Sequence, residues 1–350
     1  LLWPVTALYS FEYMRHEGSE NRFFSFFTIS FGVVLGVAFA ENFMTLYLFY
    51  ELLTLATLPL VMHTMDRKAR YAGKKYLIYS LSGAAFAFIG LVFLLNYGTT
   101  LNFTYGGVLD AAKILGNERL LRQVFVLAFF GFGVKAAIFP FHGWLPDASV
   151  APTPVSALLH AVAVVKAGVF AVMRLIYFGF GADFLRGSSA QSIAMAAAIV
   201  TIVYGSAKAL RTPHLKRRLA YSTVSNLSYI LFSFTLMTPA GLTGGLVHMV
   251  FHAVIKITLF FCAGAILYQT GKEYVYDLED FGRAMPRVFA AFTVASFALA
   301  GVPPLGGFIG KWCIATAAAQ TEMPLAYAGI AALILSTLLT TLYMMTVVVR

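Results

Sequence analysis

The chain has 350 residues, of which 60% are hydrophobic and only 11% are charged. Soluble globular domains carry about 25% charged residues, so this composition excludes an ordinary soluble enzyme and predicts an all-α, polytopic helical bundle in a lipid bilayer. The formal net charge is +10, but the cations fall in short loops between apolar segments, so we expect no nucleic-acid partner. Cys262 and Cys313 lie in apolar stretches, which is typical of core residues rather than of a disulfide or a metal pair.

Apolar spans of about 20 residues predict helices that cross a membrane. We expect the end of a helix at 1–11 and ten full helices after it. Because the chain starts with Leu1 and is still apolar close to Arg350, we also expect sequence to be missing at both ends. The ten predicted helices cover residues 23–42, 43–62, 74–95, 122–141, 154–178, 190–209, 218–237, 242–269, 286–315 and 324–349.

Two of these spans contain residues that break helices. The span 286–315 is too long for one straight crossing and contains PPLGG at 303–307, which predicts a full break. The span 122–141 contains Pro140, which predicts a milder one. Non-helical backbone at membrane depth is tolerated where protein or a water-filled cavity surrounds it, so both breaks indicate a transport path.

The ten helices divide into two sets of five, and the fourth member of each set is a broken helix that carries a lysine, Lys135 or Lys311. Five crossings are an odd number, so consecutive sets enter the membrane from opposite sides. We therefore predict two inverted five-helix repeats with broken helices, at 23–178 and 190–349. Residues 1–22 are expected to form the end of a preceding helix and a loop on the cytoplasmic side.

Lysine and arginine are distributed unevenly between the two sides of the predicted bundle. Sixteen fall on one side and four on the other, while five lie within helices. Basic loops stay on the cytoplasmic side of a membrane, so we expect this side to be cytoplasmic and the membrane to be a prokaryotic inner membrane. The opposite loop 96–121 is expected to hold a short interfacial helix or to be a plain loop. The sixteen cations lie in loops 12–22, 63–75, 142–153, 209–218 and 270–287 and at Arg350.

Several charged side chains lie inside predicted helices, where each lysine costs roughly 2.5–3.5 kcal/mol. Glu51 is a lone carboxylate in the span 43–62, and Lys135 and Lys166 are its expected partners. A contact between such residues can work as a proton switch, and the alternative is a buried structural ion pair. Lysine can lose its proton when desolvated, whereas arginine stays charged, so the lysines favour proton transfer.

Histidines accompany these lysines. His248, His252 and Lys256 recur at intervals of four residues and share one face of a helix, which predicts a ladder of proton sites. The alternative of a zinc pair lacks a third ligand nearby in the sequence. His160 can relay a proton between helices, or can be a hydrogen-bonded core histidine. Lys311 follows the break at 303–307 and is predicted to be a further proton site. The alternative interpretation is that its side chain extends to the membrane interface.

The sequence contains no phosphate loop, no cysteine set for haem or iron–sulfur clusters and no nucleotide-binding fingerprint. We therefore expect no cofactor, no metal site and no active site of its own. Five unpaired buried charges together cost on the order of 12–18 kcal/mol. Four lysines cannot all pair with one glutamate, so we expect some of them to be neutral for part of a transport cycle.

Four segments together resemble the antiporter-like membrane subunits of respiratory complex I, of Mrp-type cation/proton antiporters and of membrane-bound hydrogenases. They are LYLFYELL at 46–53, the run 131–168 with WLPDA and APTPVSALLHA, HMVFHAVIKITLFFCAG at 248–264, and LAGVPPLGGFIGKWCI at 299–314. The resemblance covers almost the whole chain and implies that Glu51 and Lys135 form a switching ion pair. It also implies a proton path in which Lys166 and His160 lead to the centre of the subunit, the 248–256 stripe continues the path, and Lys311 is the terminal site of proton exchange.

The resemblance leaves three functions open. The first is a proton-translocating subunit of a redox-driven pump, with other membrane subunits and redox-active peripheral subunits as partners, so that the chain belongs to a proton-translocating oxidoreductase complex. The second is a subunit of an Mrp-type Na⁺/H⁺ antiporter. The third is a structural membrane subunit that conducts nothing.

Overall fold

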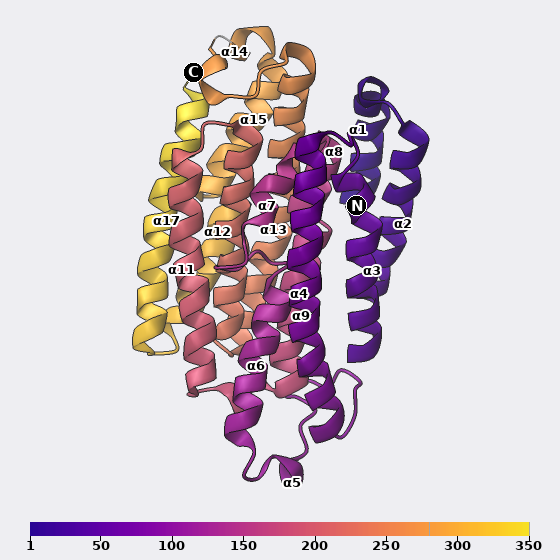
Figure 1. Ribbon diagram of the computed structural model, residues 1–350. Coiled ribbons are helices and arrows are strands. Elements are labelled where there is room, and N and C mark those ends of the chain that lie inside the picture. Colours follow the sequence, from indigo (N-terminus) through magenta and orange to yellow (C-terminus); the bar gives the residue numbers. More distant parts are fainter. Residues whose placement is uncertain (280, 350) are drawn as a thin grey trace.

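The chain forms a bundle of helices that run along one common direction (Figure 1). The structure is a computed structural model that describes residues 1–279 and 281–349. Within these ranges it contains no β-strand, and three isolated β-bridges join loops. Seven helical segments of the described chain are long and apolar enough to cross a membrane, which agrees with the predicted all-α membrane fold.

The first half of the chain packs its N-terminal helices along one edge of the bundle (Figure 1). Polar caps fix two of the helix starts: Asn42 accepts from the Thr45 amide at 2.8 Å, and Asp66 accepts from the Ala69 amide at 2.7 Å. The elements are α1 (Leu2–Glu17), α2 (Glu20–Ala38), α3 (Phe43–Val61), α4 (Arg67–Tyr97), α5 (Ala111–Ile114), α6 (Glu118–Gly133), α7 (Trp144–Asp147), the 3₁₀ turn η1 (Ala148–Val150), α8 (Thr153–Ala161), α9 (Val164–Arg174) and the π-helical turn η2 (Leu175–Phe180).

The second half places α17 and α11 at the opposite edge (Figure 1). Ser188 and Thr238 cap its helix starts by accepting from the Gln191 and Gly241 amides. Its elements are α10 (Ala182–Leu185), α11 (Ser189–Arg211), α12 (Leu215–Thr235), α13 (Pro239–Thr270), the 3₁₀ turn η3 (Val275–Asp277), α14 (Phe281–Ala284), α15 (Pro286–Ala300), α16 (Gly306–Ala319) and α17 (Pro324–Val348).

Four predicted helix limits are wrong. The helix predicted at 74–95 already starts at Arg67, so the five cations assigned to the loop 63–75 lie in α4. The first helix does not end at residue 11 but continues to Glu17, so the loop before α2 is only a tight turn. The helix predicted at 122–141 already ends at Gly133, far before Pro140. The helix predicted at 154–178 is interrupted between α8 and α9, because Val162 and Ala163 leave helical geometry.

The break predicted in the span 286–315 is confirmed. α15 ends at Ala300, Gly301 adopts a φ of 89°, and α16 starts at Gly306. The loop 96–121 contains one helical turn, α5, and is otherwise irregular, so the plain-loop interpretation describes it better than an interfacial helix.

The loops gather at two ends of the bundle, and we call the end where α1, α3 and α13 finish the basic end (Figure 1). At the basic end, the His63 ring donates to the Gly18 carbonyl at 2.9 Å, and His214 and Tyr274 form a β-bridge. At the other end, Asn42 and Asn102 form a β-bridge. Arg350, one of the sixteen cations assigned to the basic end, lies outside the described residues.

Helix α12 lies inside the bundle and is buried along almost its whole length. It packs against α11 and α13, and also contacts α9, α16 and α17. It has lysine and arginine near its start and Ser, Thr and Asn along its length, and it is not among the seven apolar spans of the described chain. A buried helix rich in Ser, Thr and Asn therefore lies next to the elements that carry the predicted proton sites.

Candidate functional site

Lys135 lies in non-helical backbone and not in a helix. The chain leaves helical geometry after Gly133, and Ala137 has a φ of 56°. Side chains satisfy the backbone groups that this frees: the Trp144 indole donates to the Val134 carbonyl at 2.8 Å, and the Thr201 hydroxyl accepts from the Phe139 amide at 3.0 Å. Residues 134–138 of the unwound segment are thus enclosed by protein, as membrane depth requires.

The structure brings Lys135 and Glu51 together. The Lys135 Nζ atom lies 3.7 Å from Glu51 Oε1, while its side chain is fully buried and that of Glu51 is 24% exposed. The ammonium also donates to the Tyr50 carbonyl and lies 3.4 Å from the centre of the Tyr50 ring. The pair is an ion pair at a spacing longer than a hydrogen bond, which leaves both groups able to exchange partners.

Lys166, the second expected partner of Glu51, instead contacts a histidine. Its Nζ atom lies 2.7 Å from Nδ1 of His252, and within the described residues it makes no ion pair. It also borders a cavity of about 160 Å³ between α2, α9 and α13. His160 is buried and stacks on Phe260 with ring centres 4.8 Å apart. Neither of its ring nitrogens has a hydrogen-bond partner among the described residues.

The stripe on α13 is buried over its whole length. The rings of His248 and His252 lie 6.1 Å apart between centres. Lys256 donates to the Leu219 carbonyl at 3.0 Å and to the Ser222 hydroxyl. Within the described residues no group of three His, Cys, Asp or Glu side chains could hold a metal.

Lys311 does not snorkel to an interface. It is 9% exposed, and its Nζ atom donates to the carbonyls of Leu299 and Ala300 at 2.9 and 3.0 Å. These are the last carbonyls of α15, where the helix dipole favours a positive charge. The break at 301–305 therefore creates the acceptors that hold this lysine.

Helix α12 supplies polar groups that the sequence analysis did not select. The Asn226 amide donates to the Ser222 carbonyl at 2.8 Å, so its Oδ1 atom faces Nε2 of His248 at 3.3 Å. His248 must then carry its proton on Nε2 when neutral. Lys216, assigned to a loop from sequence, is buried and donates to the Ala151 carbonyl at 2.9 Å. Polar residues at 222, 225, 226 and 229 recur at helical spacing, and this pattern could have revealed the buried face.

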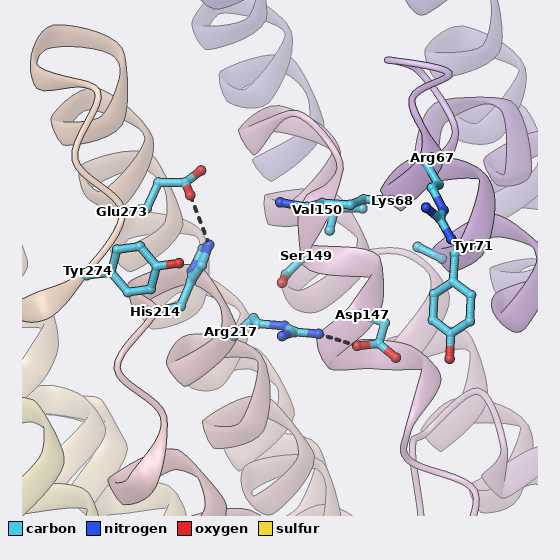
Figure 2. A pocket seen from close by; sticks show the side chains of 11 residues that line it. Arg67, Lys68, Tyr71, Asp147, Ser149, Val150, His214, Arg217, Glu273 and Tyr274 are labelled. Carbon is cyan, nitrogen blue, oxygen red and sulfur yellow. Dashed lines mark hydrogen bonds and ion pairs between the residues drawn. The ribbon is translucent and has the colours of Figure 1, made fainter.

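A pocket of about 450 Å³ opens at the basic end, away from the eight predicted residues (Figure 2). One ion pair, Arg217 with Asp147, lines it, and the His214 Nε2 atom lies 3.6 Å from a carboxylate oxygen of Glu273. Asp147 also accepts from Lys75 at 2.7 Å, so it ties the segment after the unwound backbone to α4 and α12. Burial lowers the pKa of His214.

A family model described as the transmembrane part of NADH:quinone oxidoreductases and Mrp antiporters matches residues 40–340. The chain belongs to this family. It is therefore an integral, multi-pass membrane protein, as its seven apolar spans indicate. This confirms the family resemblance drawn from the segments around Glu51, Lys135, Lys256 and Lys311.

Two relatives of this antiporter-family chain are similar over nearly its whole length. It is 33% identical over 335 residues to an NADH-quinone oxidoreductase subunit N from Desulforudis audaxviator, covering 95% of this chain and 65% of the relative. It is 33% identical over 340 residues to a Na⁺/H⁺ antiporter subunit from Alkalihalophilus pseudofirmus, covering 91% of this chain and 41% of the relative. The chain thus spans less than two thirds of either relative.

Solved structures have the same fold as this antiporter-family chain. A chain of the archaeal membrane-bound sulfane sulfur reductase, a respiratory membrane complex, matches with a TM-score of 0.81 and 25% identity. A chain of the Mrp complex from Dietzia sp. matches with the same TM-score and 24% identity. Each match covers 92% of this chain, and 65% and 59% of the respective solved chain. Both solved chains belong to membrane complexes.

Proposed function

We propose that the chain is the proton-translocating, antiporter-like membrane subunit of a multisubunit redox-driven ion pump. The observation that carries this proposal is a set of four buried lysines: Lys135, Lys166, Lys256 and Lys311. Of these four, only Lys135 has a carboxylate oxygen of the described residues within 4 Å. The other three are held by carbonyls, a hydroxyl and an imidazole, groups that accept hydrogen bonds from lysine without neutralising its charge.

The cost of these charges supports a role in titration. A lysine at the bilayer centre costs about 2.5–3.5 kcal/mol, and a buried arrangement that only stabilised the fold would gain more from apolar side chains. Lysine can shed its proton when desolvated, while arginine cannot. A helix bundle that repeatedly places lysine beside neutral acceptors is suited to pass protons.

In the proposed route, the Glu51–Lys135 pair is the switch of the first half. Breaking this pair releases a proton toward Lys166, which meets the α13 stripe at His252, and His160 lies beside the stripe through its contact with Phe260. Lys311 at the end of α15 is the exchange site of the second half. We propose no direction of flow.

The architecture around this route is part of the proposal. The segments 23–178 and 190–349 form two inverted five-helix repeats, in which α6 with its unwound extension corresponds to α15 and α16. The basic end faces the cytoplasm of a prokaryotic cell, where redox-active peripheral subunits bind. The first statement is supported by the paired helix breaks. The second is supported by the basic loops at one end of the bundle.

Lys135→Ala in the assembled complex tests the proposal, with proton translocation measured in vesicles that are supplied with the electron donor. We expect translocation to fall about 100-fold while the variant assembles normally. Lys113→Ala, in the exposed turn α5, is the matched control and should translocate normally. Normal translocation by Lys135→Ala would contradict the proposal.

A subunit of an Mrp-type Na⁺/H⁺ antiporter is the second candidate, favoured by the 33% identity to a Na⁺/H⁺ antiporter subunit. Its signature is Na⁺-dependent proton exchange in the same vesicles without electron donor. A third candidate, a structural subunit that conducts nothing, predicts that Glu51, Lys166 and Lys311 variants impair assembly but never the transport of complexes that do assemble.

A further inference from the structure

A groove between α6 and α11 opens at the end of the bundle opposite the basic end, where both of these helices begin (Figure 1). The two helices pack against each other, and the groove between their first turns has a volume of about 460 Å³. Arg119, Arg122 and Gln123 line it from α6, and Ser189 lines it from α11. None of the described residues that line it is acidic. The groove therefore presents two positive charges beside two neutral polar side chains.

The two arginines of the groove are not neutralised by the described part of the chain. None of its carboxylate oxygens lies within 4 Å of Arg119 or Arg122, and Glu118 on the same turn of α6 does not line the groove. Arg122 donates to the Phe184 carbonyl at a long 3.4 Å, and its buried Nε atom has no hydrogen-bond partner among the described residues. A buried donor without a partner is costly, so the groove has unfilled capacity for an acceptor.

The overall charge bias of the chain does not account for these two arginines. Sixteen of the 25 lysines and arginines fall on the opposite side of the predicted bundle, and only four fall on this side. The other two of these four have backbone acceptors: Lys113 donates to the Asn96 carbonyl at 3.2 Å, and Arg186 donates to the Met237 carbonyl at 2.6 Å. Half of the cations on the poorly charged side thus line one groove, which indicates a local anionic ligand.

The groove continues from its charged mouth onto apolar side chains. Val126 on α6 and Ile193 on α11 also line it, and each lies about one turn beyond a polar lining residue of its own helix. Ile193 is 47% exposed, and Val200, about two turns further along the same face of α11, is 49% exposed. Helix α11 is one of the apolar spans that can cross a membrane. A cationic mouth at the helix starts therefore leads to an apolar wall at bilayer depth.

A phosphodiester that carries an acyl chain matches both parts of this groove. Arginine binds phosphate oxygens through two parallel N–H groups, and Gln123 and Ser189 can donate further hydrogen bonds. The described lining offers no carboxylate to a positively charged headgroup such as choline, whereas a headgroup with a net negative charge balances the arginines. Free inorganic phosphate has the same oxygens but makes no use of the apolar wall.

We propose that the groove between α6 and α11 binds an anionic phospholipid, with its phosphate at Arg119 and Arg122 and an acyl chain along Ile193. The lipid supplies the acceptor that the buried Nε atom of Arg122 lacks. It also covers an apolar face that α6 and α11 leave exposed. The inference is independent of the proposed function, because it holds whether or not the chain translocates protons.

Photolabelling of the assembled complex in phosphatidylcholine vesicles tests this site. The probe is a tracer amount of phosphatidylglycerol with a photoreactive acyl chain, compared with a phosphatidylcholine analogue, and mass spectrometry quantifies the label on peptides of α6 and α11. Arg119→Gln is the main variant, because an exposed position tolerates substitution without loss of the fold. Lys113→Gln, which removes one exposed charge at the same end of the bundle, is the matched control.

We expect phosphatidylglycerol to label α6 and α11 more strongly than phosphatidylcholine does. Arg119→Gln and Arg122→Gln should each lower this labelling about 5-fold, and Lys113→Gln should leave it unchanged. Ile193→Trp, which fills the apolar part of the groove and keeps both arginines, should also lower it. An excess of inorganic phosphate should not compete with the lipid.

Equal labelling by the two lipids, or labelling that both arginine variants leave unchanged, would overturn the inference. Displacement of the label by inorganic phosphate would also overturn it, because the groove would then be a site for the free anion. If the arginine variants detach a neighbouring subunit while the labelling stays normal, the groove is a protein contact and the assignment to a lipid is wrong.

Discussion

Lys166 and His252 meet across two helices that are far apart in the sequence, with Nζ 2.7 Å from Nδ1. When Lys166 is charged it can only donate, so the neutral His252 ring then carries its proton on Nε2. That nitrogen has no hydrogen-bond partner among the described residues. The contact thus joins the hairpin of α8 and α9 to the α13 stripe, and deprotonation of Lys166 lets its amine accept from Nδ1, so that the His252 proton can move from Nε2 to Nδ1.

The first prediction concerns this contact. Lys166→Met should lower proton translocation about 100-fold, and adding His252→Gln should lower it little further, because two steps in one series are not additive. Translocation in vesicles, normalised to assembled complex, measures this. Lys208→Met, an exposed lysine on α11, is the control. Independent, multiplying losses in the double variant would show that the two residues act in separate paths.

The second prediction uses the close approach of α16 to α13. A Cβ atom at Gly310 would lie 2.6 Å from Nδ1 of His248, so Gly310→Ala must displace the imidazole. We expect a loss of stability of about 1–3 kcal/mol and lower translocation in the complexes that assemble. Gly32→Ala on α2, where a Cβ meets nothing within 4 Å, should leave both unchanged. Normal translocation by Gly310→Ala would mean that the position of His248 is not critical.

The third prediction concerns Asp147, which pairs with Lys75 at 2.7 Å and with Arg217. Asp147→Asn should lower stability by about 1 kcal/mol, as for partly exposed pairs in a network, and high salt should shrink the difference. Thermal unfolding in detergent measures both effects. Asp183→Asn, which removes an exposed pair with Arg186, should change little. Equal effects of the two variants would show that the bridge between α4 and α12 contributes no more to thermal stability than an exposed ion pair does.

The fourth prediction is a pH dependence at His63, outside the membrane-crossing helices. Burial lowers its pKa, so the unfolded chain binds a proton more readily than the folded one. The stabilising contribution is therefore complete above about pH 6.5 and is lost as the pH falls below that value. Thermal unfolding between pH 7.5 and 5.5 should show the loss. His63→Gln, which can still donate to the Gly18 carbonyl, should show a smaller loss; an identical pH profile would contradict the assignment.

The sequence predicted the features that depend on local chemistry. Prolines and glycines at 303–307 located the break before Lys311. A lone carboxylate among lysines left Lys135 and Lys166 as partners of Glu51, and the family resemblance selected Lys135, which the structure shows. The sequence did not predict that the chain unwinds from Val134, because no residue there forbids a helix. That unwinding is fixed by tertiary contacts, such as the hydrogen bond from the Trp144 indole.

The sequence also could not predict which groups hold Lys256 and Lys311. Lys256 and Lys311 are held by backbone carbonyls and a hydroxyl, and every residue has a carbonyl, so no pattern marks the right one. A cluster of buried hydroxyls on Ser206, Ser225, Tyr229 and Ser336 joins residues more than 100 positions apart. Its contribution from α12 was visible as polar residues at helical spacing, but Ser336 on α17 is a single serine in an apolar helix.

The last prediction separates charge from proton release at Lys311. Lys311→Arg keeps a cation that can donate to the Leu299 and Ala300 carbonyls, but arginine does not lose its proton in proteins. The variant should therefore assemble with near-normal thermal stability and translocate about 100-fold more slowly. Arg174→Lys, the opposite exchange at a guanidinium that packs on the Phe103 ring at 4.4 Å, should leave translocation unchanged. Normal translocation by Lys311→Arg would show that this residue holds the end of α15 electrostatically and does not exchange a proton.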